Sequence, residues 1–439
     1  MSRKRDSLLT LLERADRVAA NGLVDRRVFL RRGMTAAGTA AGVIAASWAV
    51  TAGAADSIGD NAMPWQRVPG APFRPYGQPS PFAGAVQRTV LQPYGELAPG
   101  AGNSMTPLHA LQGTITPSGL HFERHHNGVP AIDPSKHTLT IHGLVDRPLT
   151  FDMNALFRYP MVSRICFIEC SGNSFFNTMA EPQQKPCGMI HGMVSCSEWT
   201  GVPLAVLLEE AGVRPNAQWM LAEGADSAAM SRSIPLEKAR SDVIVALYQN
   251  GEPVRPEQGY PMRLVIPGYE GNMNVKWLHR LKLTEGPTQT KDETSKYTDS
   301  MPDGKAEQFT FVMGVKSVIT HPTVGVSMQG KGFYEISGLA WSGAGKVKRV
   351  EVSADGGRSW GDAHLQEPVL DKSLTRFTMA WQWDGGPAQL QSRATDDQGR
   401  VQGTRKDWTA KYVPGQRYHY NAIQTWAVGE AGRISNVYL

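Results

Sequence analysis

The stretch that most constrains this chain is Arg164-Ile-Cys-Phe-Ile-Glu-Cys-Ser-Gly-Asn173. It is typical of a short apolar strand that runs into a tight Ser-Gly-Asn turn. Cys170 then stands at the exit of the strand, where a side chain can point into a cleft. A thiolate suits a soft or high-valent metal, although a cysteine at a strand end often serves packing alone. The hypothesis is that Cys170 anchors a metal cofactor, and other motifs must supply a pocket around it.

Charge separates residues 1–54 from the rest of the chain. The net charge is +5, but residues 1–54 hold nine Lys and Arg against four Asp and Glu, which leaves 36 of each sign in the remainder. A neutral remainder offers no broad basic surface for nucleic acid. The four cysteines are too few for a disulfide scaffold. Cys166 is expected in the core, and Cys187 and Cys196 are candidates for a pair in an oxidising compartment.

The N-terminus has the pattern of an export address. An arginine pair in Asp25-Arg-Arg-Val-Phe-Leu-Arg31 precedes an Ala/Gly-rich run that ends near Ala52-Gly-Ala54. Paired arginines, a weakly apolar segment and small residues suited to cleavage are typical of a twin-arginine signal, which exports folded proteins. We therefore expect a signal over residues 1–54, a periplasmic mature protein and no membrane anchor after cleavage. The alternative, an uncleaved anchor, is disfavoured by the Ala, Gly and Thr content of the run.

Beyond the signal, the sequence predicts an arm and two domains of class α+β. Residues 55–106 are rich in Pro and Gly and predict an extended arm. Residues 107–300 mix strand and helix patterns, including an amphipathic helix over Trp199–Gly212. Residues 284–308 are polar and predict a linker. Residues 305–439 repeat short alternating strands between Gly-rich turns, which predicts an immunoglobulin-like antiparallel β-sandwich.

Polar side chains stand beside turns in residues 107–300. Arg124 and His126 precede a Gly-Val-Pro turn, and a guanidinium offers a planar fork to an oxyanion. Arg263 lies on an apolar strand before a Gly-rich bend, and Lys276 follows, so this region can hold a phosphate. The sequence has no Cys-x-x-Cys-His for a covalent haem and no Gly-x-Gly-x-x-Gly after a strand for a nicotinamide or flavin.

Taken in order, these motifs resemble the sulfite oxidase family of molybdopterin enzymes over about residues 105–439. The elements that match the family are Arg124-His-His126 with Val129-Pro130, Cys170-Ser-Gly-Asn173, Trp199-Thr-Gly201, Ser233-Ile-Pro235, Gly259-Tyr-Pro-Met-Arg263, Val275-Lys-Trp277, Gly338–Gly343 and Val352–Trp360. Each motif is modest, but their order and spacing are specific.

The resemblance implies a fold, a cofactor and a set of roles. The fold is a mixed α/β molybdopterin-binding domain of the sulfite oxidase type, followed by the sandwich, which often serves dimerisation. The cofactor is one molybdenum-molybdopterin per chain, with Cys170 as the metal ligand and no haem in this chain. The residues implied in cofactor binding are Arg124, His126, Cys170, Asp226, Arg263 and Lys276, and those implied in catalysis are Arg124, Cys170 and Tyr297.

Departures from the sulfite oxidase pattern bear on the substrate. Ser174 and Phe175 replace an arginine of the family, a second arginine aligns near Ala431 with Arg433 beside it, and a tryptophan aligns with Met189. One arginine is a weak trap for free sulfite, because a buried dianion needs matched partners. The pattern is similar to the molybdenum subunits of sulfane dehydrogenases. That resemblance implies oxidation of sulfane sulfur on a carrier-protein cysteine, a c-type dihaem cytochrome partner and a homodimer formed through the C-terminal domain.

Three other interpretations remain open. The chain can be a sulfite dehydrogenase that acts on free sulfite. It can be a scaffold subunit without metal, although Cys170 and Tyr297 argue against that. A methionine sulfoxide reductase is disfavoured because enzymes of that kind lack the sandwich domain.

Overall fold

The computed structural model describes residues 18–24, 63–84, 86–91, 96, 98–415 and 418–439, and the chain divides into two units. One unit comprises Met1–Asp16 and Asp25–Val86. Its described part holds two 3-10 turns, η2 (Pro64–Gln66) and η3 (Pro81–Ala83). The other unit comprises Arg17–Val24 and Gln87–Leu439 and contains all the remaining described elements. Within the described residues, every helix is too short or too polar to cross a membrane.

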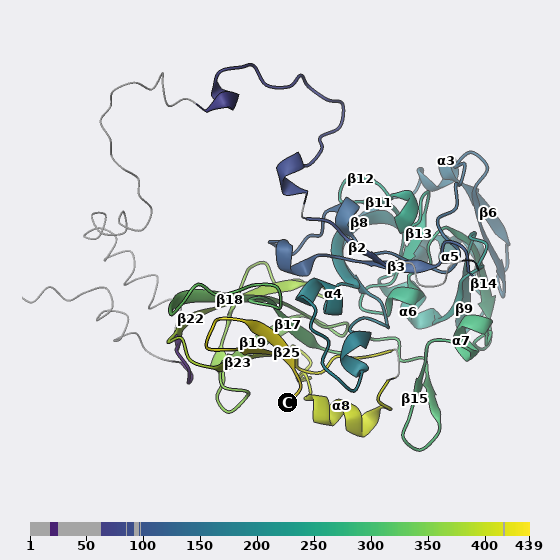
Figure 1. Cartoon of the computed structure of the whole chain (residues 1–439). Coiled ribbons are helices and arrows are strands. Elements are labelled where there is room, and N and C mark those ends of the chain that lie inside the picture. Colours follow the sequence, from purple (N-terminus) through teal and green to yellow (C-terminus); the bar gives the residue numbers. More distant parts are fainter. Residues whose placement is uncertain (1–17, 25–62, 85, 92–95, 97, 416–417) are drawn as a thin grey trace, which may run out of the picture. The chain divides into compact units, whose positions relative to one another are not determined.

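The N-terminal part of the second unit contains three sheets (Figure 1). The first sheet, β10-β9-β14-β5-β6, is mixed, since β14 runs parallel to β5. The second has the order β12-β11-β8-β7, with β13 also paired to β11, and the third is β2-β3-β4. The bounds are β2 (Thr89–Leu91), β3 (Gly102–Met105), β4 (Arg124–His125), β5 (Thr138–Gly143), β6 (Leu149–Asp152), β7 (Val162–Glu169), β8 (Val194–Pro203), β9 (Trp219–Gly224), β10 (Ser231–Pro235), β11 (Ile244–Gln249), β12 (Glu252–Pro253), β13 (Arg263–Val265) and β14 (Leu278–Thr284).

Helix α5 (Leu204–Ala211) shows how local pattern and packing agree. Its buried residues recur at helical spacing and join the core between the first two sheets: Leu204, Leu207, Leu208 and Ala211. Gly212 ends the helix in a left-handed conformation, with φ of 68°. The predicted helix over Trp199–Gly212 is wrong in its first half, because Trp199–Pro203 belong to strand β8. Trp199, Gly201 and Val202 are buried on the sheet, and Pro203 stands at the N-cap of the helix.

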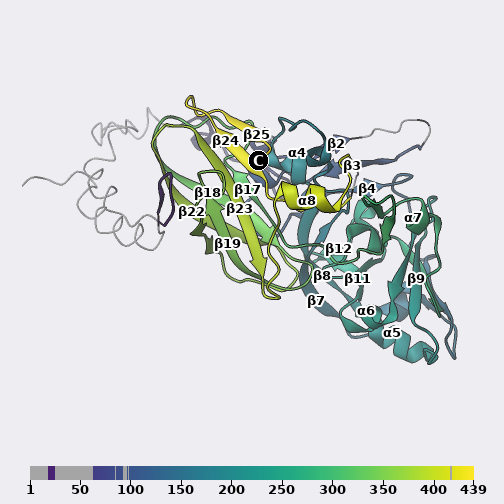
Figure 2. The same cartoon turned by 90° about the horizontal axis from the view of Figure 1, so that it is seen from below.

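The C-terminal part is an antiparallel sandwich, as predicted. One sheet has the order β1-β22-β18-β17 with β21 on β22, and the other β20-β19-β23-β24-β25 (Figure 2). Trp341, Trp381 and Trp426 are fully buried in the shared core. The bounds are β1 (Leu23–Val24), β17 (Lys316–His321), β18 (Gly332–Trp341), β19 (Val347–Ser353), β20 (Gly361–Asp362), β21 (His364–Leu365), β22 (Thr375–Trp383), β23 (Ala388–Asp396), β24 (Thr425–Val428) and β25 (Ile434–Val437).

Three predicted segments include residues that the structure describes. Most of the predicted signal over residues 1–54 lies outside the described residues, but Leu23 and Val24 pair with Trp381 and Ala380 of β22. The predicted arm over residues 55–106 is wrong for its last part, because β2 pairs with β3 and β3 pairs with β4 of the following domain. Those strands are short and barely alternate, so their pattern resembles irregular chain. The predicted linker over residues 284–308 contains helix α7 (Lys291–Thr294) and the hairpin of β15 (Thr298–Ser300) and β16 (Ala306–Gln308).

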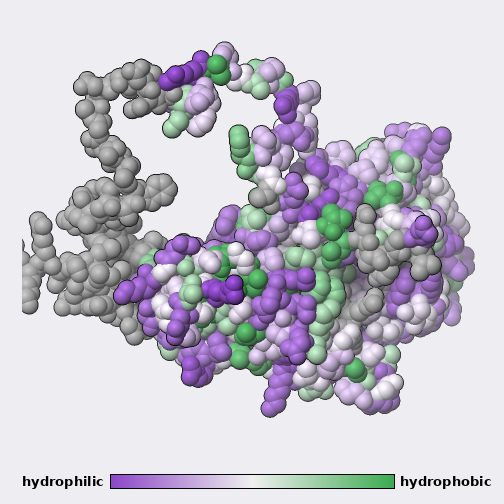
Figure 3. Space-filling view, viewed as in Figure 1, coloured by the Kyte–Doolittle hydropathy of each residue, from purple (hydrophilic) through white to green (hydrophobic). Residues whose placement is uncertain are grey.

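One hydrophobic core contains residues of both domains and includes part of β7. Phe167 joins the sandwich core and lies 6.4 Å from the ring of Trp341. Helix α4 (Cys187–His191) adds Cys187 to the same core. The strand that leads into Cys170 therefore packs against both domains. The surface of the described part is mostly hydrophilic on the face shown in Figure 3, with small hydrophobic groups among the polar ones.

The remaining short helices are α3 (Met153–Leu156), α6 (Leu236–Ser241) and α8 (Arg405–Lys411), and the 3-10 turns of this unit are η5 (Leu108–Ala110), η6 (Ser118–Leu120), η7 (Phe175–Thr178), η8 (Pro256–Gln258) and η9 (Gly271–Met273). Several of them frame the pocket described next.

Candidate active site

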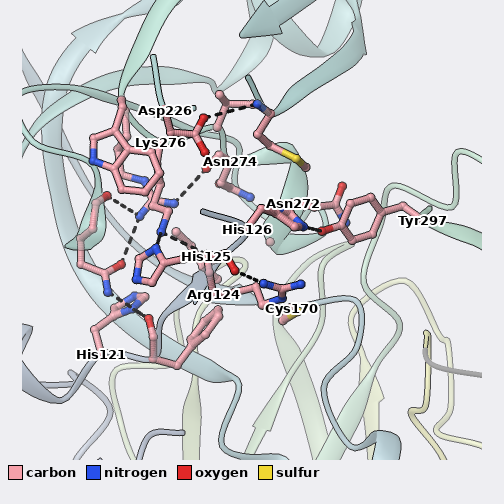
Figure 4. A pocket seen from close by; sticks show the side chains of 18 residues that line it. His121, Arg124, His125, His126, Cys170, Asp226, Asn272, Asn274, Lys276 and Tyr297 are labelled. Carbon is pink, nitrogen blue, oxygen red and sulfur yellow. Dashed lines mark hydrogen bonds between the residues drawn. The ribbon is translucent and has the colours of Figure 1, made fainter. Parts of the chain in front are cut away.

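A pocket of about 680 Å³, including its open mouth, lies where β4, β7, β13 and the turn around Lys276 meet (Figure 4). Seven sequence-predicted site residues line it: Arg124, His126, Cys170, Asp226, Arg263, Lys276 and Tyr297. The structure thus brings together side chains that are separated by up to 173 residues in the sequence. Their individual roles remain predictions.

Cys170 follows the last residue of β7 and is fixed through its backbone. Its amide donates to the carbonyl of Met193 at 2.9 Å, and its carbonyl accepts from the amide of Asn173 at 2.8 Å. Burial raises the pKa of the Cys170 thiol, while a backbone hydrogen bond from Gly172 and the charge of Arg124 act in the opposite direction. A buried thiol of this kind ionises when a metal binds to it. The environment therefore suits a metal ligand better than a free nucleophile.

Arg124 reaches this cysteine from strand β4. Its guanidinium donates to the carbonyls of Gly102 and His125, and it extends toward Cys170 in Figure 4. Gly102 belongs to β3, the strand that the sequence did not predict. The charge of Arg124 acts on both the Cys170 thiol and the Tyr297 hydroxyl. It is thus placed to stabilise negative charge beside the cysteine.

Tyr297 and His126 form a hydrogen-bonded pair at the pocket wall. The Tyr297 hydroxyl lies 3.2 Å from His126 Nε2, and the two rings meet edge to face. Burial, assisted by the charge of Arg124, lowers the pKa of His126 to about 3. Burial also raises the pKa of Tyr297. Both groups are consequently neutral at pH 7, so the pair can offer or accept a hydrogen bond without changing the charge of the pocket.

Two further cations line the pocket, and of these Arg263 is buried and Lys276 is partly buried. Arg263 donates to the carbonyls of Gln258 at 2.9 Å and Asn274 at 3.0 Å. Lys276 donates to the carbonyls of Arg124 at 3.2 Å and Glu257 at 3.1 Å. Burial lowers the pKa of Arg263 to about 9 and that of Lys276 well below its usual range. Their hydrogen bonds go to neutral acceptors, so neither cation is paired directly with a carboxylate.

Asp226 is the one predicted site residue that carries negative charge. It accepts a hydrogen bond from the Met230 amide at 3.4 Å and is mostly buried. Burial raises the pKa of its carboxyl, and the charge of Lys276 opposes that shift. Within the part of the chain that the structure describes, Arg124, Arg263 and Lys276 form no ion pair with a carboxylate. The charges of Glu123 and Asp226 act on Lys276 from nearby, but neither carboxylate pairs with it directly.

The sequence analysis missed several residues that line the pocket. His125 lies between Lys276 Nζ, 2.8 Å from its Nδ1, and Glu123, 2.7 Å from its Nε2. His121 hydrogen-bonds through Nδ1 to the Phe122 carbonyl, and its buried Nε2 has no protein partner. Asn272 likewise has a buried carbonyl oxygen without a partner. Of these, only His125 stands within a motif named above, and spacing alone did not indicate which way its side chain points.

The residues present fit a molybdopterin. A pterin with a phosphate brings negative charge and several hydrogen-bonding edges, and the pocket offers cations without a direct carboxylate partner together with unpartnered acceptors. Arg124, His126, Arg263, Lys276 and Asp226 would hold such a group, and Cys170 would bind its metal. When bound, the group would supply oxygen-atom transfer and two-electron redox chemistry.

Some positions of the sequence comparison lie elsewhere. Ser174 is fully buried and contacts Lys316 and His191, so it faces away from the pocket. Met189 on α4 is not among the lining residues, and Arg433 is exposed beside Ser327 in the sandwich. Arg433 therefore does not line the pocket around Cys170 in this chain. Arg124 is the arginine whose charge acts on Cys170.

The other cysteines have structural surroundings. Cys166, Cys187 and Cys196 are buried and free. The suggested disulfide between Cys187 and Cys196 is absent. Burial raises the pKa of Cys187 to about 12 and that of Cys166 further. The expectation that Cys166 belongs to the core is confirmed.

Comparison with known proteins agrees with this geometry. Residues 126–291 match the family model of the oxidoreductase molybdopterin binding domain, and residues 307–426 match that of the Mo-co oxidoreductase dimerisation domain. The crystal structure of the sulfane dehydrogenase SoxCD from Paracoccus pantotrophus superposes with a TM-score of 0.84. That chain is 44% identical, and the match covers 88% of this chain and all of that one.

Curated relatives are more distant. The NADPH nitrate reductase of Phytophthora infestans is 32% identical over 64% of this chain and 34% of its own length. The mitochondrial sulfite oxidase of Mus musculus is 30% identical over 64% of this chain and 55% of its own length. The chain thus spans about a third to a half of the length of these relatives. With the full-length structural match and both matched domains, the chain belongs to the sulfite oxidase family of molybdopterin-binding oxidoreductases.

Proposed function

We propose that this chain is the molybdenum subunit of a sulfane dehydrogenase. It would oxidise sulfane sulfur held on a cysteine of a carrier protein and pass electrons to a c-type dihaem cytochrome. The observation that supports this choice over free sulfite is the single arginine, Arg124, whose charge acts on Cys170. The higher identity to a sulfane dehydrogenase, 44% over that whole chain, points the same way.

The proposed reaction assigns roles to Arg124, to Tyr297 and to the walls of the pocket. Each two-electron oxidation adds one oxygen atom from water to the sulfur and releases two protons. Arg124 stabilises the negative charge that develops on the oxidised sulfur group. Tyr297, hydrogen-bonded to the neutral His126, orients that group through its hydroxyl. The buried walls exclude bulk water, so that these few contacts act at full strength.

The setting proposed for this reaction is the periplasm. The predicted signal over residues 1–54 would deliver the folded, loaded protein by the twin-arginine route. A homodimer through the C-terminal sandwich is proposed from the match of residues 307–426 to a dimerisation domain. These assignments are separable from the catalytic one, since each has its own measurement.

Metal analysis combined with two substrates tests the proposal. The purified protein should contain about one molybdenum per chain and reduce cytochrome c faster with a carrier-bound sulfane than with free sulfite. Cys170→Ser should lose the metal and the turnover together. Efficient oxidation of free sulfite would instead support a sulfite dehydrogenase. A chain that takes up no molybdenum in a host that makes the cofactor would be a scaffold subunit.

A further inference from the structure

Glu169, the residue before Cys170, is a fully buried carboxylate on the side of β7 opposite the pocket. Three donors converge on it. Lys316 Nζ lies 3.1 Å from Oε1, Asn173 Nδ2 2.9 Å from Oε1, and Trp341 Nε1 2.6 Å from Oε2. Glu169 is therefore fully satisfied, as a buried charge must be.

Two of the three donors come from the sandwich domain. Lys316 begins β17 and Trp341 ends β18, and these residues pair directly in that sheet. Both are 1% exposed or less. Lys316 also donates to Ser174 Oγ at 2.7 Å and to the Tyr420 carbonyl at 2.9 Å. The C-terminal domain thus holds the chain immediately before Cys170 and again four residues after it.

Gly271 packs closely against the backbone of Glu169 and Cys170. A Cβ atom added to Gly271 would lie 2.8 Å from the Glu169 carbonyl oxygen and 3.1 Å from Cys170 Cα. Such approaches are closer than packed atoms tolerate, so the backbone at Glu169 and Cys170 rests directly on Gly271. Gly271 thus restrains the backbone at Glu169 and Cys170 from one side, while the hydrogen bonds of Lys316 and Trp341 restrain the side chain of Glu169 from the other.

We propose that Lys316 and Trp341 are positioning residues for Cys170, so that the C-terminal sandwich is part of the support of the metal site. The inference rests on the proposed function in one respect, namely that Cys170 binds the metal. The sandwich domain then has a role within each chain that is independent of dimerisation. Its residues set the position of the thiol through Glu169 without entering the pocket.

Trp341→Phe tests this, because it removes one of the three donors to Glu169 and leaves the charges unchanged. Trp426→Phe is the matched control, since Trp426 is equally buried in the same core and donates instead to the Ile319 carbonyl at 3.0 Å. Two readouts are needed. One is the electron paramagnetic resonance spectrum of the bound metal. The other is the alkylation rate of Cys170, followed by mass spectrometry, in full-length chain made without cofactor.

We expect Trp341→Phe to alter the spectrum and to change the alkylation rate about threefold to tenfold, the range of one hydrogen bond. Trp426→Phe should leave both as in the wild type. Equal behaviour of the two variants would overturn the inference. If Trp341→Phe does not fold, Glu169→Gln keeps an oxygen for the Trp341 N–H while losing the attraction of Lys316, and an unchanged alkylation rate in it would also overturn the inference. Cys170→Ser that retains molybdenum would sink the proposed function, whereas the alkylation result stands without it.

Discussion

Buried cations on the two sides of Cys170 are treated in opposite ways. In the pocket, Arg263 and Lys276 donate only to neutral acceptors, and burial depresses the pKa of both. Behind the cysteine, burial also lowers the pKa of Lys316, but this lysine is fully buried and lies 3.1 Å from the carboxylate of Glu169. We call a cation open when it has no carboxylate partner in the protein, and closed when it is paired with one. An open cation is available to a ligand of opposite charge, whereas a closed cation stabilises the fold.

The largest effect is expected where the closed pair is broken. Lys316→Met leaves the Glu169 carboxylate buried without its cation, which typically costs about 3–5 kcal/mol of stability. Denaturant unfolding of the full chain would measure it. The double variant Lys316→Met/Glu169→Gln should recover more than half of the loss, because no charge then remains buried. A single Lys316→Met variant as stable as the wild type would show that the pair is not closed as described.

Sequence reasoning found the open side of this comparison and missed the closed one. Arg124, Arg263 and Lys276 stand in motifs beside turns, where a side chain is free to face a ligand, so their spacing carried information. Lys316 is one polar residue at the start of an ordinary strand, and its partner Glu169 lies 147 residues earlier. A pattern within one strand cannot indicate a pair formed across two domains.

Segment boundaries failed for a related reason. Trp199–Pro203 carries apolar residues that fit a strand or a helix, and pairing with β7 and β11 decides in favour of the strand. Residues 89–91 and 102–105 look irregular until β4 pairs with β3. The sandwich was predictable because its strands are long, alternate regularly and end at Gly-rich turns. Local pattern sufficed there, and tertiary pairing was needed elsewhere.

His126, on the pocket side of Cys170, should make the stability of the chain depend on pH. Its pKa is about 3 in the folded chain, against about 6.5 when unfolded. Between these values the unfolded chain binds a proton that the folded chain does not, so stability falls as the pH falls. The free energy of unfolding of the cofactor-free chain should fall between pH 6.5 and pH 4.5, and His126→Gln should make that decrease smaller by about 2–3 kcal/mol. Denaturation curves at the two pH values check this, and parallel curves for both proteins would mean that His126 is protonated in the folded state.

A smaller change is expected where an open cation is removed. Lys276→Met loses hydrogen bonds to two carbonyls and to His125, but it also removes a desolvated charge. The stability of the cofactor-free chain should therefore change by about 1 kcal/mol or less. The same variant should bind the pterin poorly, which cofactor extraction and quantification would show. A loss of stability as large as that of Lys316→Met, with cofactor content intact, would erase the distinction between the two sides.

The smallest effect is expected at Arg433, a cation that neither lines the pocket nor lies in the core. It is exposed, and its described contact is a backbone bridge to Ser327. Arg433→Ala should alter stability by about 0.5 kcal/mol or less. Turnover with either sulfur substrate should stay within error of the wild type, because the side chain does not line the pocket. Steady-state kinetics decide the matter, and a selective loss of sulfite oxidation in Arg433→Ala would restore this residue as a substrate arginine and weaken the argument from a single arginine at Cys170.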